Sequence, residues 1–289
     1  MKEKTRVLIP LDGSTIGDAV LLAIQPLIHS RHVEVTLLHV AKSPAEAEAE
    51  VVQKLDQHRD ALKSYGVPAR VRIVSGAPGQ EILRQAAIGE FDLIAMATHG
   101  RSGMDRVLMG SVAEEVIRSS QTPTLLCKTR GRIGTWERIV VAVDGTPGSE
   151  EILGDAVRLA RSLGSTIYLL QVGLALLRTD SYRGVSFHHA AEDPTAYLEQ
   201  TAARLAAEGI SVVPEHREGM AGVEIPILAK QLDAGLICMT TEGRPEIAPG
   251  LGRSVAAEVI QTSPCPVYVR HMCGAAGTRA KIGKAAKAH

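Results

Sequence analysis

The chain has 289 residues, which at about 150 residues per domain is enough for two domains that each bury a core. Lys plus Arg number 32 and Asp plus Glu number 32, while 45% of the residues are apolar and only 3% aromatic. This neutral, apolar composition excludes a disordered chain. It also argues against capture of nucleic acid by net charge and against stacking of single-stranded bases on aromatic side chains.

Apolar runs alternate with amphipathic stretches along the first 131 residues. Pro26 falls inside the first amphipathic stretch and should kink or restart that helix. Strands of unbroken Val, Ile and Leu, alternating with helices, predict a parallel sheet covered on both faces, which right-handed crossovers make a doubly wound α/β domain. Strands are expected at 7–11, 33–40, 71–74, 92–97 and 124–128, and helices at about 16–28, 44–66, 78–87 and 111–119.

The second half of the chain repeats the first. Val7–Ser14 matches Ile139–Thr146 at an offset of 132, and His99–Arg101 matches Glu242–Arg244 at an offset of 143, so the second copy carries 11 extra residues after about Gly173. The predicted domains are 1–131 and 132–271, followed by a basic disordered tail at 272–289. We expect a pseudo-twofold pair in which strands 123–128 and 266–270 are neighbours, because an unpaired edge strand needs cover.

A glycine-rich loop marks the candidate site of the first unit. In an open parallel sheet the ligand crevice lies beyond the carboxyl ends of the strands, where the winding direction reverses. The strand ending at Ala97 runs into a loop that reaches Gly110, where a helix starts with Ser111 as its expected cap. Free amides at a helix N-terminus bind phosphate well. The loop contains neither G-K-[ST] nor G-x-G-x-x-G, and by itself it could serve only tight turns.

Three segments together resemble the universal stress protein family: Pro10–Ser14, Leu37–Val40 and Ala97–Glu114. The repeat resembles a tandem member of that family. The family's nucleotide signature is G-x-x-G, nine residues, then G-[ST], and here Ala97 stands in place of the first glycine. The resemblance implies ATP, with or without Mg²⁺, held by Pro10, Asp12, Val40, Met96, Ala97, Gly100, Arg101, Gly110, Ser111 and Val112.

The second unit departs further from this signature. Its matching positions are Thr240, Gly243, Arg253 and Ser254, so an arginine replaces the glycine that faces phosphate. An arginine stem should obstruct close approach of the backbone to phosphate, although a guanidinium could also pair with an anion. We predict a degenerate second crevice and one nucleotide per chain.

Other polar residues leave alternatives open. Asp12 and Asp144 follow the first strand of each unit and either contact nucleotide or cap a turn. The loop residue His99 is expected to form a hydrogen bond rather than to act as a base, and the adjacent His188 and His189 are not expected to bind metal.

Three functions compete at this stage. The leading hypothesis is an ATP-binding stress-response regulator with no catalytic residue and at most slow hydrolysis. An ATP-hydrolysing or nucleotidyl-transferring enzyme on the same fold is the second, and a nucleotide-independent scaffold or small-ligand binder is the third. An intramolecular pair of domains with an unidentified protein partner is expected, and the sequence leaves open whether the chain also pairs as a homodimer.

The same residues predict a cytoplasmic protein. The four cysteines show no C-x-x-C spacing and are expected to be free thiols. The apolar run Val7–Ile9 is too short for a signal peptide, and no stretch reaches the about 18 apolar residues of a membrane span.

Overall fold

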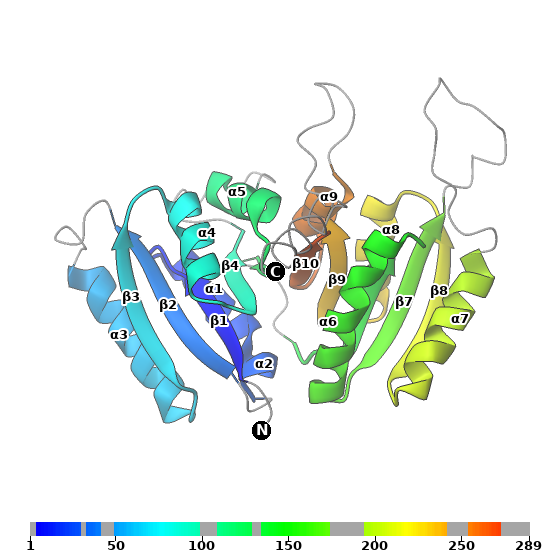
Figure 1. Ribbon diagram of the computed structural model, residues 1–289, viewed down its shortest axis with the longest axis horizontal. Helices are drawn as coiled ribbons and strands as arrows, with labels where there is room; N and C mark the ends of the chain where they lie inside the picture. Colours follow the sequence, from blue (N-terminus) through cyan, green and yellow to red (C-terminus); the bar gives the residue numbers. More distant parts are fainter. Residues whose placement is uncertain are drawn as a thin grey trace, which may run out of the picture.

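The computed structural model describes residues 4–29, 33–41, 49–98, 109–128, 134–173, 194–241 and 254–272. Ten strands form one sheet with the order β3-β2-β1-β4-β5-β10-β9-β6-β7-β8. Figure 1 shows the first unit in blue to cyan on the left and the second in green to red on the right. Every strand pair is parallel except the pair β5–β10, where the two units meet. The predicted α/β architecture with two doubly wound units is therefore confirmed.

The first unit follows the predicted alternation closely, and the expected helix 111–119 is reproduced with its bounds. Pro26 separates the first helical stretch into two helices. The elements are β1 (Thr5–Pro10), α1 (Thr15–Ala23), α2 (Gln25–His29), β2 (Val33–Ala41), α3 (Ala49–Ser64), β3 (Ala69–Ser75), α4 (Pro78–Ile88), β4 (Leu93–Ala97), α5 (Ser111–Ser119) and β5 (Thr124–Cys127).

The second unit repeats this order with one uninterrupted first helix, because Arg158 occupies the position of Pro26. Its length difference lies between Gly173, which matches Ala41, and Ala207, which matches Ser64. The elements are β6 (Arg138–Val143), α6 (Pro147–Leu163), β7 (Thr166–Gly173), α7 (Pro194–Ala207), β8 (Ser211–Glu218), α8 (Ala221–Gln231), β9 (Leu236–Thr241), α9 (Val255–Thr262) and β10 (Val267–His271).

The seam between the units is a short antiparallel ladder. Tyr268 of β10 pairs with Leu125 of β5, and these two residues occupy the same position of the repeat. A local twofold axis therefore passes between them, and it relates the flanking ladder pairs to each other. This confirms the predicted neighbourhood of strands 123–128 and 266–270, and among the strands that the structure describes it leaves β3 and β8 at the edges of the sheet.

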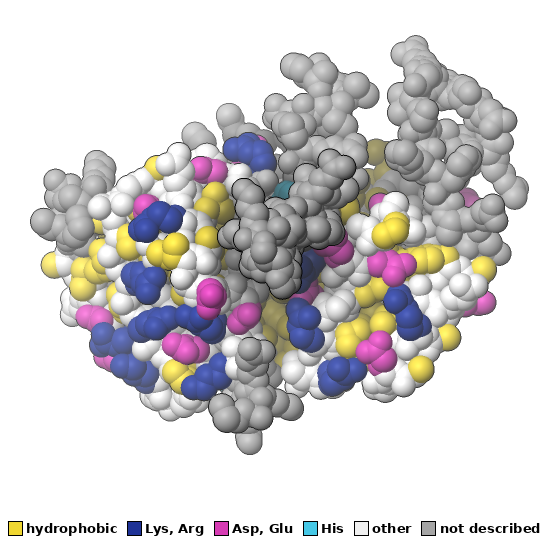
Figure 2. Space-filling model, in the orientation of Figure 1, with side chains coloured by type: hydrophobic (Ala, Val, Ile, Leu, Met, Phe, Trp, Pro, Cys, Tyr) yellow, Lys and Arg dark blue, Asp and Glu magenta, His cyan; other side chains and the backbone are white. Residues whose placement is uncertain are grey.

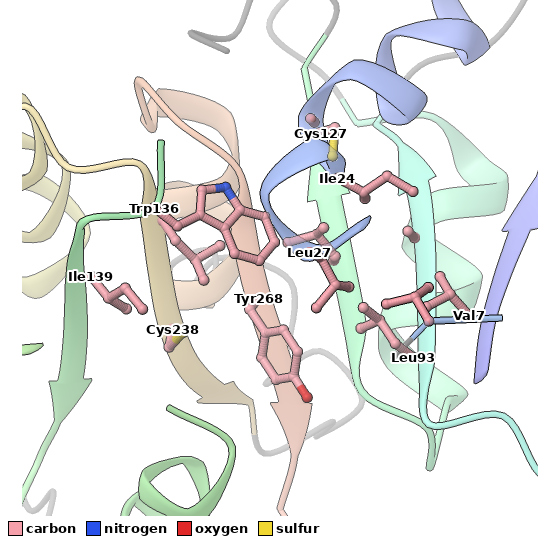
Figure 3. Close-up of a cluster of buried hydrophobic side chains, with 14 of the residues drawn as sticks. Val7, Ile24, Leu27, Leu93, Cys127, Trp136, Ile139, Cys238 and Tyr268 are labelled. Carbon is pink, nitrogen blue, oxygen red and sulfur yellow. The ribbon is translucent and has the colours of Figure 1, made fainter. Parts of the chain in front are cut away.

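Two apolar layers fill the space between the sheet and its helices. One layer lies under α1, α2, α3, α6 and α7, and the other lies under α4, α5, α8 and α9. The first layer is continuous across the seam. In Figure 3, Trp136, which precedes β6, lies beside Leu27 of α2, and Tyr268 lies below them. The two units thus share one hydrophobic core on this side of the sheet.

The face of the molecule drawn in Figure 2 carries both signs of charge without segregating them. Figure 2 shows Lys and Arg side chains beside Asp and Glu side chains over both units, with hydrophobic side chains between them, on the face that it draws. This mixture agrees with the formal net charge of zero. None of the described helices is long and apolar enough to cross a membrane.

Candidate functional site

The winding direction reverses between β1 and β4. From β1 the chain proceeds outward through β2 to β3, whereas β4 and β5 lie on the opposite side of β1. Parallel neighbours end at the same edge of the sheet, so Pro10 at the end of β1 and Ala97 at the end of β4 lie at the edge where open α/β sheets hold their ligand crevice. In the second unit the corresponding reversal lies between β6 and β9.

A tight turn after β1 forms one wall of this crevice. The backbone N–H and the hydroxyl of Ser14 both donate to Asp12 Oδ1, at 2.9 and 2.6 Å. Ser14 is the N-cap of α1, and its Oγ accepts from the Gly17 N–H at 3.1 Å. Gly13 between them has φ +82°, a conformation that favours glycine. Asp12 therefore does cap this turn, which was one of the two roles considered for it.

The other wall is the N-terminus of α5. Gly110 is its N-cap, with φ −65° and ψ 146°, and the Gly110 N–H donates to the Thr98 carbonyl at 2.8 Å. The first intrahelical bond runs from the Glu114 N–H to the Gly110 carbonyl, so the N–H groups of Ser111, Val112 and Ala113 have no partner within the helix. Gly110 has no side chain with which to cap them. Three amides with the positive end of the helix dipole are thus directed out of α5.

In the second unit a serine side chain caps the equivalent helix, α9. Ser254 is the N-cap of α9, and its Oγ accepts from the Ala257 N–H at 3.2 Å. The repeat offset of 143 pairs Ser254 with Ser111. The same offset relates the next turn of the two helices, where Glu115 lies against Gly79 and Glu258 lies against Gly222. Yet Ser111 is the first helical residue of α5, whereas Ser254 precedes α9. The second helix therefore begins one residue later than the first.

This difference predicts that replacing Ser254 and Ser111 by alanine changes the free energy of unfolding by unequal amounts. Ser254→Ala should lower the free energy of unfolding by about 1 kcal/mol, the usual value of a serine N-cap, because the Ala257 N–H loses its acceptor. Ser111→Ala should change it by only a few tenths of that value, because Ser111 is not the cap. Urea denaturation of both variants measures the difference, and equal losses would contradict the assigned caps.

The predicted site residues that the structure describes gather at one edge of the first unit. Pro10 and Asp12 lie at the end of β1, Val40 near the end of β2, and Met96 and Ala97 at the end of β4. Gly110, Ser111 and Val112 form the start of α5. Gly100 and Arg101 lie outside the described residues, as do His99, Gly243, Arg253, and the pair His188 and His189.

One expectation about this site was wrong, and two contributors were missed. The cap of α5 is Gly110 and not Ser111, because glycine is itself an acceptable N-cap and allows the helix to start one residue earlier. Thr98 was missed, although its position directly after a strand at the winding reversal could have identified it. It is 3% exposed, and its N–H donates to the Cys127 carbonyl at 2.9 Å. Lys54 of α3, whose Nζ donates to the Gly13 carbonyl at 2.9 Å, was missed because it reaches this turn from another helix.

Two further predictions concern the turn of the second unit and metal binding. Asp144 forms the same turn as Asp12, with its Oδ1 accepting from the Thr146 N–H at 2.9 Å and from the Thr146 hydroxyl at 2.6 Å. Among the residues that the structure describes, no three His, Cys, Asp or Glu side chains gather as a metal site.

Comparison with known proteins identifies the family of this chain. The family model described as "Universal stress protein family" matches residues 4–128 and again residues 135–271. Universal stress protein MJ0531 of Methanocaldococcus jannaschii is 32% identical over 139 residues, which cover 43% of this chain and 81% of that protein.

A solved structure of full length shows a similar fold. The crystal structure of a universal stress protein from Archaeoglobus fulgidus is 21% identical, covers 93% of this chain and 97% of its own, and superposes with a TM-score of 0.70, a likeness of fold. Another universal stress protein from that organism, in complex with dAMP, is 17% identical and covers 44% of this chain and 98% of its own, with a TM-score of 0.34. Because the family model matches both halves of the repeat, this chain belongs to the universal stress protein family and carries two of its units in tandem.

Proposed function

We propose that this chain is a stress-response regulator that binds one adenine nucleotide, ATP, in the crevice of its first unit. The observation that carries the proposal is the open N-terminus of α5 beside the winding reversal of the sheet. Three unpaired amides there can each donate to a phosphate oxygen, and hydrogen bonds to a charged group contribute about 1.5 to 3 kcal/mol each.

The remaining walls of the crevice suit the rest of a nucleotide. Val40 and Ala97 offer backbone groups at the ends of β2 and β4, on either side of β1. Asp12 brings a carboxylate to the same edge, where it could accept from a ribose hydroxyl or hold Mg²⁺. We assign the adenine to the region of Asp12 and Val40, the ribose to Ala97 and the phosphates to Gly110, Ser111 and Val112.

The second unit supports a stoichiometry of one. Ser254 occupies the end of α9 with its own hydroxyl, so one of the amides that would meet a phosphate is already bonded. A ligand there would have to displace this cap. The one-residue later start of α9 also moves its free amides relative to the ends of β6 and β9. An anionic ligand therefore favours the first crevice.

We also place the protein in the cytoplasm, since the three cysteines that the structure describes are free thiols. All three are buried. Burial raises the pKa of Cys127 and Cys238, and it raises the pKa of Cys265 to about 11. The thiols are therefore protonated at neutral pH and have little reactivity toward oxidants, as befits structural core residues.

The test is the nucleotide stoichiometry of the purified chain. Calorimetric titration with ATP, together with identification of any small molecule released on denaturation, should give about one adenine nucleotide per chain. Removal of the capping hydroxyl by Ser254→Gly serves as a control, since it should raise the stoichiometry only if the cap alone closes the second crevice. No binding in the wild-type chain would refute the proposal, and a stoichiometry of two would refute the asymmetry.

A further inference from the structure

A charged cluster on the first unit reaches the crevice from beside it. Lys54 Nζ lies 2.7 Å from Asp18 Oδ2, and His58 Nε2 lies 3.0 Å from Asp18 Oδ1. The side chains of Lys54, Asp18 and His58 are each about a quarter exposed, with values of 25, 23 and 24%. Asp18 is on α1, whereas Lys54 and His58 are one turn apart on α3. We call these three residues the Lys54 cluster.

The Lys54 ammonium also holds the turn that bounds the crevice. It donates to the Gly13 carbonyl at 2.9 Å. Gly13 lies between Asp12 and Ser14, whose side chains are bonded to each other within the turn. The bond from Lys54 is therefore an additional one, made to the turn by a residue of another helix. Gly13 has the widest backbone freedom in the turn because it has no Cβ. A hydrogen bond to its carbonyl therefore restricts the motion of the turn more than a bond to a neighbouring residue would.

The second unit has the same turn without the same cluster. Gly145 has φ +83°, and the bonds from Thr146 to Asp144 have the same lengths as those from Ser14 to Asp12. The repeat places Glu150, Tyr197 and Thr201 where the first unit has Asp18, Lys54 and His58. Glu150 pairs with Arg204 at 3.0 Å instead. The turn itself therefore folds without a lysine, and the added bond from Lys54 to Gly13 distinguishes the first unit from the second.

We infer that Lys54 is a positioning residue for nucleotide binding, which it supports by restraining the Gly13 carbonyl and with it the Asp12 backbone. This inference rests on the proposed function and adds to it a residue outside the family's nucleotide signature. A binding site needs its contact residues held to about 0.5 Å by supporting side chains. Losing such a support weakens binding by about tenfold or more, to judge from supporting residues around metal sites.

The experiment is a calorimetric titration of full-length variants with ATP. Lys54→Met should weaken binding by about tenfold, whereas Lys54→Arg should retain most of the affinity, because arginine can still donate to Gly13 and pair with Asp18. Asp18→Asn should weaken binding less than Lys54→Met, since the ammonium keeps its bond to Gly13. Tyr197→Phe is the matched control in the second unit and should leave the affinity unchanged.

The outcomes separate this inference from the function on which it rests. A wild-type chain that binds no nucleotide overturns both. A wild-type chain that binds, together with a Lys54→Met variant of equal affinity, overturns the inference alone. If Lys54→Met and Lys54→Arg both lose affinity and both melt at clearly lower temperature than the wild type, the role of Lys54 is structural and the inference is also overturned.

Discussion

Replacing Gly110 by arginine should abolish ATP binding to the first unit while the chain remains folded. Gly110 has φ −65°, so a side chain at this position meets no backbone penalty and the fold should tolerate it. An arginine stem immediately before Ser111 would, however, occupy the space through which phosphate approaches the amides of Ser111 and Val112. Losing two or three hydrogen bonds of about 1.5 to 3 kcal/mol each removes about 3 to 9 kcal/mol, compared with the about 8 kcal/mol that corresponds to micromolar affinity, so binding weakens by at least about 100-fold.

A matched variant separates obstruction from charge. The Gly110→Leu variant carries a side chain of similar reach but no cation, so it should lose binding as fully as Gly110→Arg. Titration calorimetry measures both affinities, and far-ultraviolet circular dichroism checks the fold. Unchanged affinity in both variants would show that the start of α5 is not the phosphate site. Retained binding in the arginine variant alone would show that a guanidinium can replace the amides as the partner of phosphate.

The architecture was predictable because it depends on patterns that repeat along the chain. Apolar runs of Val, Ile and Leu gave strands such as 33–40, which the structure extends by one residue to Ala41. Pro26 divided the first helical stretch as its missing N–H requires. The internal repeat then predicted the pairing of β5 with β10, since two copies of one unit leave the same strand unpaired in each.

The cap of α5 was not predicted correctly, although the sequence contains the reason for it. Ser111 and Ser254 align, which suggested one role for both. The residue before Ser111 is glycine, an acceptable N-cap, whereas the residue before Ser254 is arginine, which is not. Each helix starts at the first residue able to cap it. Comparing cap preferences at both positions, rather than aligning the serines, would have placed the helix starts.

Contacts between distant side chains could not be predicted. Lys54 meets Gly13 across 41 residues, and Asp155 meets Arg270 across 115 residues. Periodicity assigns residues to a face of a helix, but it does not state which polar groups on two elements come within bonding distance. The burial of Asp155 was especially hard to predict, because an aspartate within an amphipathic helix ordinarily faces water.

Asp155→Ala should be among the most destabilising single substitutions in the chain. The Asp155 side chain is only 1% exposed, and it bonds to the guanidinium groups of Arg270 on β10 and Arg158 on α6. The hydrogen bond from Asp155 raises the pKa of Arg270 further. A guanidinium remains protonated at neutral pH even without such a partner, so removing Asp155 leaves the charge of Arg270 unpaired. Breaking a buried ion pair from one side costs about 3 to 5 kcal/mol. We expect the lower end of that range, because Arg270 is 27% exposed and can partly reach water.

The first unit supplies the control for this prediction. The positions that match Asp155 and Arg270 are Ala23 and Cys127, so the double variant Asp155→Ala, Arg270→Cys copies an apolar pair that the same fold already holds. It should lose less stability than Asp155→Ala alone, because the half-buried charge of Arg270 is removed together with its partner. Arg158→Ala should cost under about 1 kcal/mol, since Arg158 is 68% exposed and its ion pair is screened by water. Denaturant titration of the three variants measures the differences. A double variant less stable than Asp155→Ala would show that the two side chains act mainly by filling space, and that the charge pair adds little to the core of the second unit.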